Sequence, residues 1–144
     1  MTNQNLFSLN AIEIFQLFKS GTKFLEKNVD VINSLNVFPV PDGDTGINML
    51  LTLKSATDSV ENSSVNGSVS AMISALAKGA LLGARGNSGV IFSQFIKGMA
   101  TGLQACNECD GIYLQKALSN AAEAGYLAVG NPVEGTMLTV MKAA

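Results

Sequence analysis

Apolar residues recur at every third or fourth position through most of the chain, which is the spacing of one face of a helix. In the stretch 11–27, for example, Ile12, Phe15, Phe18 and Leu25 fall at near-helical intervals. No stretch shows the alternation of a half-buried strand. The pattern predicts an all-α chain. The expected helices span residues 11–27, 29–35, 46–59, 69–82, 87–104 and 111–129, with a last one from 133 to 144.

Proline and glycine separate these helices. Pro39 and Pro41 fix their own φ and push the residues before them toward extended backbone, so the segment around them cannot be helical. Gly83 to Gly86 interrupts the helical pattern, and Asn87 or Ser88 is expected to cap the helix that follows. The sequence has no internal repeat, so we expect a single domain over residues 1–144.

The composition is low in charge for a helical protein. Charged residues make up 14% of the chain, against about 25% in typical soluble domains, and the mean hydropathy is +0.29. Either this is a plain alanine-rich helical domain, or part of its surface is covered by a partner, a missing segment or an apolar ligand. The last helix reaches Ala144 without a terminating Gly or Pro, so we expect a fragment of a longer protein.

Several classes of protein are disfavoured by the same composition. No uninterrupted apolar stretch reaches the ~18 residues of a membrane-spanning helix. The N-terminus has no cationic region before an apolar one, so it is not a secretory signal, and a cytoplasmic location is expected. The net charge is −2 and Arg85 is the only arginine. Without a basic stripe, nucleic acid is not expected as the main partner.

The two cysteines, Cys106 and Cys109, form a lone C-x-x-C pair, which is compatible with half a zinc site or a redox pair. The chain has no histidine and no second cysteine pair, so it cannot build a usual four-ligand zinc site alone. We therefore expect two buried or idle thiols in a reducing cytosol.

The first candidate for chemistry is Asp42-Gly43-Asp44. Two carboxylates two residues apart repel each other unless a counter-ion lies between them, and carboxylate oxygens suit Mg²⁺. The alternative is a solvated turn followed by a helix that Asp44 or Thr45 caps. In the metal interpretation, Thr45 and Asn48 lie in the first turn of the next helix and donate to phosphate oxygens.

Two further loops precede helices. Gly83-Ala84-Arg85-Gly86-Asn87-Ser88-Gly89 presents free backbone N–H groups at a helix start, which suits a phosphate. Taken alone it is more typical of a simple helix junction, and Arg85 stabilises phosphate charge or merely pairs with Asp42 or Asp44. In the second loop, 131–137, Thr136 offers a hydroxyl and Met137 an apolar surface for an adenine ring. The alternative there is an ordinary first helical turn.

Three segments together resemble the nucleotide-binding domain of the dihydroxyacetone kinase L-subunit type, and more closely the N-terminal domain of the bacterial fatty acid kinases. They occur in the family's order and span about residues 10–144. The first contains Asn33, then Leu35-Asn36-Val37-Phe38-Pro39-Val40-Pro41-Asp42-Gly43-Asp44-Thr45-Gly46, then Asn48-Met49; the second is Gly83-Ala84-Arg85-Gly86-Asn87-Ser88-Gly89-Val90; the third is Pro132-Val133-Glu134-Gly135-Thr136-Met137-Leu138.

The resemblance implies an antiparallel helical barrel or bundle, truncated at its C-terminal end, that holds ATP in loops at one end. It implies two Mg²⁺ ions with Asp42 and Asp44 as ligands. Where the dihydroxyacetone kinase pattern has another aspartate, the closest position here is Asn36. Either Asn36 coordinates through its side-chain oxygen or a second ion is held more weakly. Arg85 is expected to act on the transferred phosphate. The nucleotide-binding positions implied are Thr45, Gly46, Asn48, Met49, Gly83, Ala84, Gly86, Asn87, Ser88 and Gly89 on the phosphate side, and Thr136 and Met137 on the adenine side.

The implied activity is transfer of the γ-phosphate to a fatty acid carboxylate presented by a separate fatty-acid-binding protein, giving an acyl phosphate. A carboxylate acceptor needs no histidine base, because carboxylic acids with a pKa of about 4 are already ionised at neutral pH. The alternatives are phosphotransfer of the dihydroxyacetone kinase type, a nucleotide- or lipid-binding module that is inactive by itself, and a structural helical domain with neither ligand. The sequence leaves a homodimer open.

Overall fold

The computed structural model describes residues 7–38, 40–64 and 67–144 of the chain. Pro39, which the sequence predicts to have extended backbone beside it, lies outside these residues. The described residues form no β-strand, and Leu9 and Cys109 make one isolated antiparallel bridge. This confirms the all-α prediction. The helices are α1 (Ala11–Ser34), α2 (Thr45–Glu61), α3 (Val69–Gly83), α4 (Gly86–Gly102), α5 (Gly111–Leu127) and α6 (Met137–Ala143).

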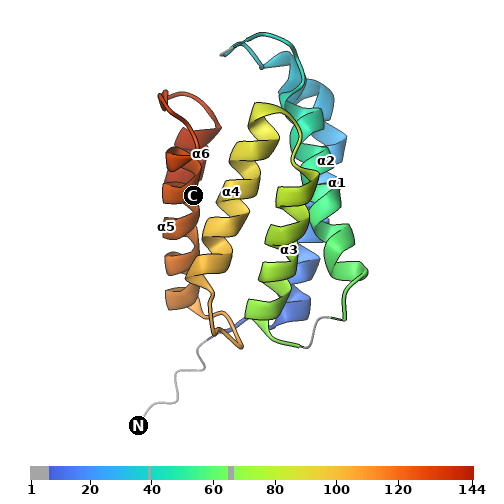
Figure 1. The fold of residues 1–144 in the computed structure, drawn as a ribbon, viewed down its shortest axis with the longest axis vertical. Helices are drawn as coiled ribbons and strands as arrows, with labels where there is room; N and C mark the ends of the chain where they lie inside the picture. The colour runs from blue at the N-terminus through green and yellow to red at the C-terminus, as the bar shows by residue number, and fades with distance from the viewer. Residues whose placement is uncertain (1–6, 39, 65–66) are drawn as a thin grey trace.

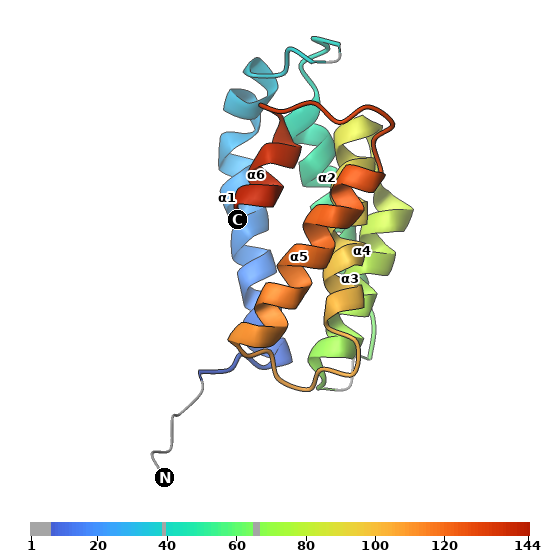
Figure 2. The same cartoon turned by 90° about the vertical axis from the view of Figure 1, so that its left-hand side faces the viewer.

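Successive helices run in opposite directions, as Figure 1 shows. Each helix packs against the next one along the chain, and α2 also contacts α4. In Figure 1, α1 and α2 lie on one side of the molecule and α5 and α6 on the other, with α3 and α4 between them. Because the directions alternate, the α1–α2, α3–α4 and α5–α6 connections all lie at one end of the bundle, which is the upper end in Figures 1 and 2.

The core forms where α1 to α5 turn apolar faces toward one another. Ile73 and Leu76 of α3 and Ile96 of α4 are fully buried there. Two helix pairs approach so closely that only glycine fits. A Cβ added at Gly79 would lie 2.5 Å from Ser55 O, and one added at Gly98 would lie 2.4 Å from Asn120 O. These distances are too short for any real side chain, so α2–α3 and α4–α5 pack backbone to backbone.

The first helix differs from the prediction. The sequence pattern predicts a break between residues 27 and 29, whereas α1 is continuous from Ala11 to Ser34. The Asn28 side chain, which favours turns, instead donates to Phe24 O one turn earlier at 2.8 Å, and no Gly or Pro interrupts the chain at this point. At its other end, Asn10 and Glu13 form a reciprocal capping box that fixes where α1 begins.

The predicted start of the last helix is wrong, and so are the caps predicted for α4. The last helix begins at Met137 rather than Val133, because Gly135 has φ +82° and Thr136 is the residue that caps the helix. The helix predicted to start at 87 begins at Gly86, with Arg85 at the cap position. Asn87 and Ser88 therefore lie inside its first turn and cap nothing.

Apolar side chains remain exposed on the bundle, as the low charge and high hydropathy predict. On α1, Leu17, Phe24 and Val31 follow one another at seven-residue intervals on the surface. Two ion pairs, Lys19–Glu61 and Lys54–Glu26, join α1 to α2. None of the helices in the described ranges is long and apolar enough to cross a membrane.

Candidate functional site

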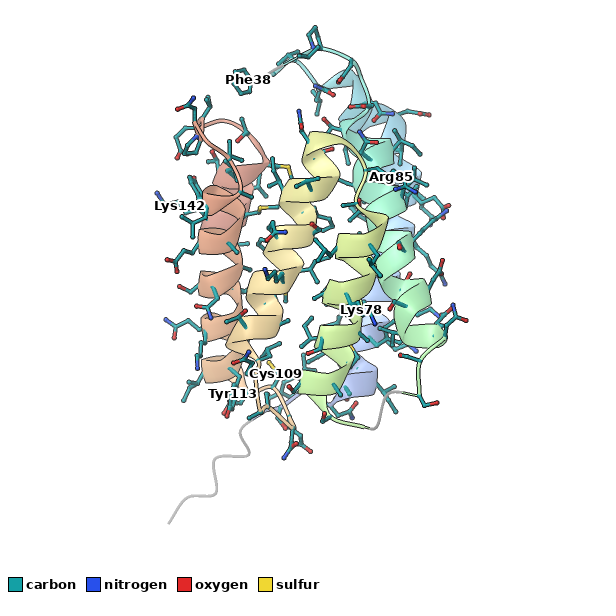
Figure 3. All side chains as sticks on the ribbon, in the orientation of Figure 1. Phe38, Lys78, Arg85, Cys109, Tyr113 and Lys142 are labelled. Atoms are coloured by element: carbon teal, nitrogen blue, oxygen red, sulfur yellow. The ribbon has the colours of Figure 1, made fainter. Side chains whose placement is uncertain are left out.

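All three loops singled out in the sequence lie at the same end of the bundle (Figures 1 and 2). The acidic loop connects α1 to α2, the glycine-rich loop connects α3 to α4, and the third loop connects α5 to α6. In Figure 3, Phe38 marks the tip of the acidic loop above the bundle, and Arg85 lies lower on the side of α2 and α3. Alternating helix direction thus collects segments that are about 45 residues apart in the chain.

The N-terminus of α2 is capped by a side chain from another helix. Asn33, in the last turn of α1, accepts hydrogen bonds from Gly46 N at 2.8 Å and from Ile47 N at 3.2 Å. A Cβ at Gly46 would lie 2.7 Å from Val29 O, so glycine is needed for this approach. Asp44 occupies the N-cap position but makes no side-chain capping hydrogen bond. The interpretation of this segment as a solvated turn expected Asp44 or Thr45 to cap the helix, and the Asp44 carboxylate does not.

The Asn36 side chain makes two hydrogen bonds within the acidic loop. Its Oδ1 accepts from Asp44 N at 3.2 Å, and its Nδ2 donates to Val40 O at 3.0 Å. Gly43 turns the chain with φ +67°. Asn36 thus contacts the backbone of Asp44, and its role as a third metal ligand stays a prediction. One lone pair of its side-chain oxygen is used by the Asp44 amide, which leaves a second for a cation.

The two carboxylates have no cationic partner in the described part of the chain. Asp42 is exposed and Asp44 is half-buried. The ion pairs found there, Lys19–Glu61 and Lys54–Glu26, involve neither of them. Two oxygen donors on one braced loop, with a neighbouring amide oxygen, match the hard ligand set that Mg²⁺ prefers. In those same residues, no group of three or more His, Cys, Asp or Glu side chains is arranged to hold a metal, so substrate oxygens would have to complete any such site.

Arg85 does not neutralise the acidic loop. It is exposed, and its guanidinium Nη1 donates to Ala84 O at 3.4 Å. Within the described ranges it makes no ion pair with Asp42 or Asp44, so the simple pairing that the sequence left open is not found. Its role toward a phosphate remains a prediction.

The first turns of α2 and α4, which follow the acidic loop and the glycine-rich loop, contact each other. Ser88 Oγ donates to Thr45 O at 3.3 Å. Gly86 has φ +57°, and a Cβ there would lie 2.3 Å from Asn48 Nδ2. A Cβ at Gly89 would lie 3.3 Å from Asn48 O. The structure therefore brings Thr45 and Asn48 against the backbone that begins α4, where amide groups are free of helix partners.

The remaining predicted residues of these two loops are placed around this contact. Gly83 ends α3 against Ser55, where a Cβ would lie 2.1 Å from the serine side chain, and Ala84 follows in extended backbone. Asn87 is exposed in the first turn of α4. Met49 is half-buried and packs against the hydrophobic core. Its role toward a nucleotide stays a prediction.

The third loop is organised around Glu134. The carboxylate accepts from Tyr126 OH at 2.9 Å and from Thr139 Oγ1 at 2.7 Å, and Thr139 Oγ1 accepts from Gly135 N at 2.8 Å. The hydrogen bond from Thr139, then that from Tyr126, and the charge of Lys142 hold the pKa of Glu134 below its ordinary value. The carboxylate thereby ties the last turn of α5 to the first turn of α6.

The predicted adenine-side residues flank this network. Thr136 Oγ1 donates to Val133 O at 2.8 Å and accepts from Leu138 N at 3.3 Å, so its hydroxyl proton is already engaged. Met137 is half-buried as the first residue of α6. The hydrogen bonds described for this loop stay within α5, α6 and the connection between them. The structure places Thr136 and Met137 at the site's end of the bundle without joining them to the other two loops.

Three residues that organise the site had no role in the sequence reasoning. Asn33 was noted only as part of a motif, and Thr52 and Glu134 carried no assignment. Thr52 lies one helical turn after Asn48, on the same face of α2, and that i, i+4 spacing is the one signal that points to it. Nothing local marks Asn33 as the cap of a helix that begins later in the chain, at Thr45.

Fold and site together define an all-α domain with an acidic, glycine-containing loop and a glycine-rich helix start at one end. Among known protein families, the one described as "DAK2 domain" matches residues 39–144 of the chain. The chain therefore belongs to the DAK2 domain family. This is a nucleotide-binding module of the dihydroxyacetone kinase type, and its family is one of kinases.

Relatives of the chain occur in Staphylococcus aureus. Uncharacterized proteins of the strains USA300 and COL are each 44% identical to it over 122 residues, which is 85% of this chain and 22% of each relative. The chain thus spans about a fifth of the length of the curated relatives that it matches.

Proposed function

We propose that the chain is the Mg-ATP-binding domain of a kinase that transfers the γ-phosphate to a fatty acid carboxylate. The acceptor is presented by a separate fatty-acid-binding protein, and the product is an acyl phosphate. The observation that carries this proposal is the Asp44 carboxylate. It stands at the start of α2 beside Asp42 and is relieved of capping by Asn33. Two neighbouring carboxylates that have no ion-pair partner in the described residues favour the binding of a cation between them.

The residues that would hold Mg²⁺ are Asp42 and Asp44, with Asn36 as the third ligand. When bound, the ion neutralises the triphosphate and draws charge from the phosphate that is transferred. The chain's own part is to hold the nucleotide. Backbone N–H groups at the start of α4, together with Thr45 and Asn48, face the phosphates, and Arg85 adds positive charge beside them.

The transfer of the γ-phosphate needs no general base from this chain. A carboxylate oxygen of the acceptor forms a bond to the γ-phosphorus, and the bond from that phosphorus to the β,γ-bridging oxygen breaks. The electron pair leaves on ADP. The acceptor is already ionised at neutral pH, because its pKa is about 4, so no proton has to be removed. The absence of histidine from the sequence is therefore no obstacle.

A transfer assay tests the proposal. The chain is mixed with Mg²⁺, γ-labelled ATP, a fatty acid and the fatty-acid-binding protein, and labelled acyl phosphate is measured. We expect label transfer that depends on all four components and that is lost in Asp42→Ala and Asp44→Ala. Transfer at the unmodified rate in either variant would contradict the assignment of these two residues.

A second candidate is a binding module that holds Mg-ATP without turning it over. It is favoured by the third loop, whose described hydrogen bonds do not join it to the two phosphate-side loops. A thermal shift with Mg-ATP followed by the same transfer assay separates the two functions. A shift without transfer favours the module, and transfer favours the kinase.

A further inference from the structure

Thr52 connects α2 to the glycine-rich loop that precedes α4. It lies one turn after Asn48 and is fully buried, with 0% of its surface exposed. Its Oγ1 donates to Asn48 O at 2.8 Å and accepts from Arg85 N at 3.3 Å. The buried Thr52 hydroxyl therefore donates to one backbone group and accepts from another. It links α2 to Arg85, which lies far away in the chain.

The start of α4 is built on this hydroxyl. A Cβ at Gly89 would lie 2.5 Å from Thr52 Oγ1, so the helix backbone touches the threonine directly. Gly89 N in turn donates to Arg85 O at 3.0 Å, which closes the first turn of α4. Arg85 therefore has its N–H held by Thr52 and its carbonyl held by Gly89. Its backbone is fixed on both sides while its guanidinium stays exposed.

A second buried threonine on the same helix makes different contacts. Thr57 Oγ1 donates toward Leu53 O and Lys54 O, both within α2. Such bonds back to the preceding turn are common for threonine in helices and position nothing else. The bond from Arg85 N to Thr52 is of another kind, because it crosses from one element of the site to another.

We propose that Thr52 is a positioning residue for the nucleotide. It holds the backbone of Arg85 so that the free amide groups of the α4 start, and the arginine side chain, are already arranged for phosphate. Thr52 is too deeply buried to touch the ligand itself. This role rests on the proposed function. By fixing the Arg85 backbone before the nucleotide binds, the Thr52 hydroxyl lowers the entropy lost when the loop becomes ordered around the nucleotide.

The test compares three variants of the chain by their Kd for Mg-ATP and by amide hydrogen exchange at Arg85. Thr52→Val keeps the size of the side chain and removes the hydroxyl; Thr52→Ser keeps the hydroxyl and removes a methyl group. Thr57→Val is the matched control on the same helix. We expect Thr52→Val to raise the Kd about tenfold and to speed exchange at Arg85, which corresponds to one buried hydrogen bond. Thr52→Ser and Thr57→Val are expected to bind like the unmodified chain.

The outcomes separate this inference from the proposed function. If the unmodified chain binds Mg-ATP and Thr52→Val binds equally well, the positioning role is wrong and the proposed function stands. If the unmodified chain binds no Mg-ATP, the proposed function is lost and this role with it. Equal losses in the valine and serine variants would attribute the effect to packing and overturn the role of the hydroxyl. Should the valine variant not fold, Thr52→Ala against Thr52→Ser decides, because both lack the methyl group and only serine keeps the hydroxyl.

Discussion

Asn33 Oδ1 accepts a hydrogen bond from Gly46 N at 2.8 Å, so a side chain from the last turn of α1 caps the N-terminus of α2. The residue at the usual capping position, Asp44, makes no such bond. Caps normally come from the N-cap residue itself, because its side chain is already at the free amides. Because Asn33 caps α2, the Asp44 carboxylate makes no capping hydrogen bond. It lies at a helix start, where the helix dipole favours negative charge.

Replacing Asn33 by alanine is expected to destabilise the chain by about 1 kcal/mol, the usual cost of a lost cap. The free energy of unfolding from urea denaturation measures it. Asn28→Ala is the matched control on the same helix, because among the described residues the Asn28 side chain bonds back to Phe24 O within α1. The control is expected to stay within about 0.5 kcal/mol of the unmodified chain, as for most surface changes. Equal effects of the two substitutions would show that Asn33 has no special role at α2.

Two glycines should respond to alanine with opposite signs. Gly98 faces Asn120 O, and its Cβ would lie 2.4 Å away, whereas nothing lies within 4 Å of a Cβ at Gly21. Gly98→Ala must separate α4 from α5 and is expected to cost about 1–3 kcal/mol. Gly21→Ala lies inside α1 and should stabilise by about 0.5–1 kcal/mol through helix propensity. Thermal unfolding of both variants checks the pair, and a stable Gly98→Ala variant would contradict the close packing described for α4 and α5.

Much of this fold follows from local sequence, and the exceptions have local causes. The helices α2, α3, α4 and α5 begin and end within about two residues of their predicted bounds. For α3 and α5 the cause is local, because Ser68 and Asp110 accept hydrogen bonds from the backbone of the first turn. The break predicted near Asn28 is absent, and the Asn28 amide donates to Phe24 O in the preceding turn of a continuous helix. The early start predicted for α6 overlooked Gly135, whose positive φ is incompatible with a continuing helix.

The site was predicted less completely than the fold. The sequence identified the three loops, since paired acids and glycine-rich helix starts are recognisable by composition. It could not identify Asn33 or Thr52, because each acts on backbone far away in the chain: Gly46 is 13 residues from Asn33, and Arg85 is 33 residues from Thr52. Met49 was grouped with the nucleotide-binding residues by its place in a motif, and it is half-buried and packs against the hydrophobic core.

Glu134 gives the α5–α6 connection a pH dependence. Its pKa is held below the ordinary value, first by the hydrogen bond from Thr139 and then by that from Tyr126. A carboxylate with a lowered pKa stabilises the folded state fully above its unfolded pKa of about 4.3, and this contribution is lost as the pH falls through the folded pKa. The connection should therefore keep this support at neutral pH and lose it only in acid.

An NMR titration of the Glu134 carboxyl measures this effect. The pKa of Glu134 is expected to rise toward its ordinary value in Thr139→Val, and to a smaller extent in Tyr126→Phe, because each variant removes one donor. The pKa of Tyr126, which burial and then the bond to Glu134 raise, should fall in Glu134→Gln. An unchanged Glu134 pKa in both donor variants would show that the network does not form in solution.

The two thiols are expected to react slowly in the folded chain. Cys106 is 1% exposed and Cys109 4%, and burial is the first cause that raises the pKa of both, with the charge of Asp110 adding to it. Since the thiolate is the reactive form, both burial and the raised pKa slow alkylation. Iodoacetamide labelling at a pH of about 8, followed by mass spectrometry, should be much slower without denaturant than in urea. Rates as fast in the native chain as in urea would contradict the buried placement of this pair.

Calorimetric titration of Mg-ATP into the chain tests the metal and phosphate site most directly, with Asp44→Asn beside it and Asp58→Asn as a control. Asp58 is an exposed aspartate on the same helix, so its variant makes the same change of charge away from the site. We expect ATP to bind only with Mg²⁺, Asp44→Asn to weaken binding by about tenfold or more, and Asp58→Asn to bind like the unmodified chain. The unfolding midpoint of Asp44→Asn should fall only slightly, because Asn33 and not Asp44 caps α2 and the variant loses only the attraction between the Asp44 charge and the helix dipole. Equal binding by Asp44→Asn and the unmodified chain, or ATP binding that does not depend on Mg²⁺, would contradict the site.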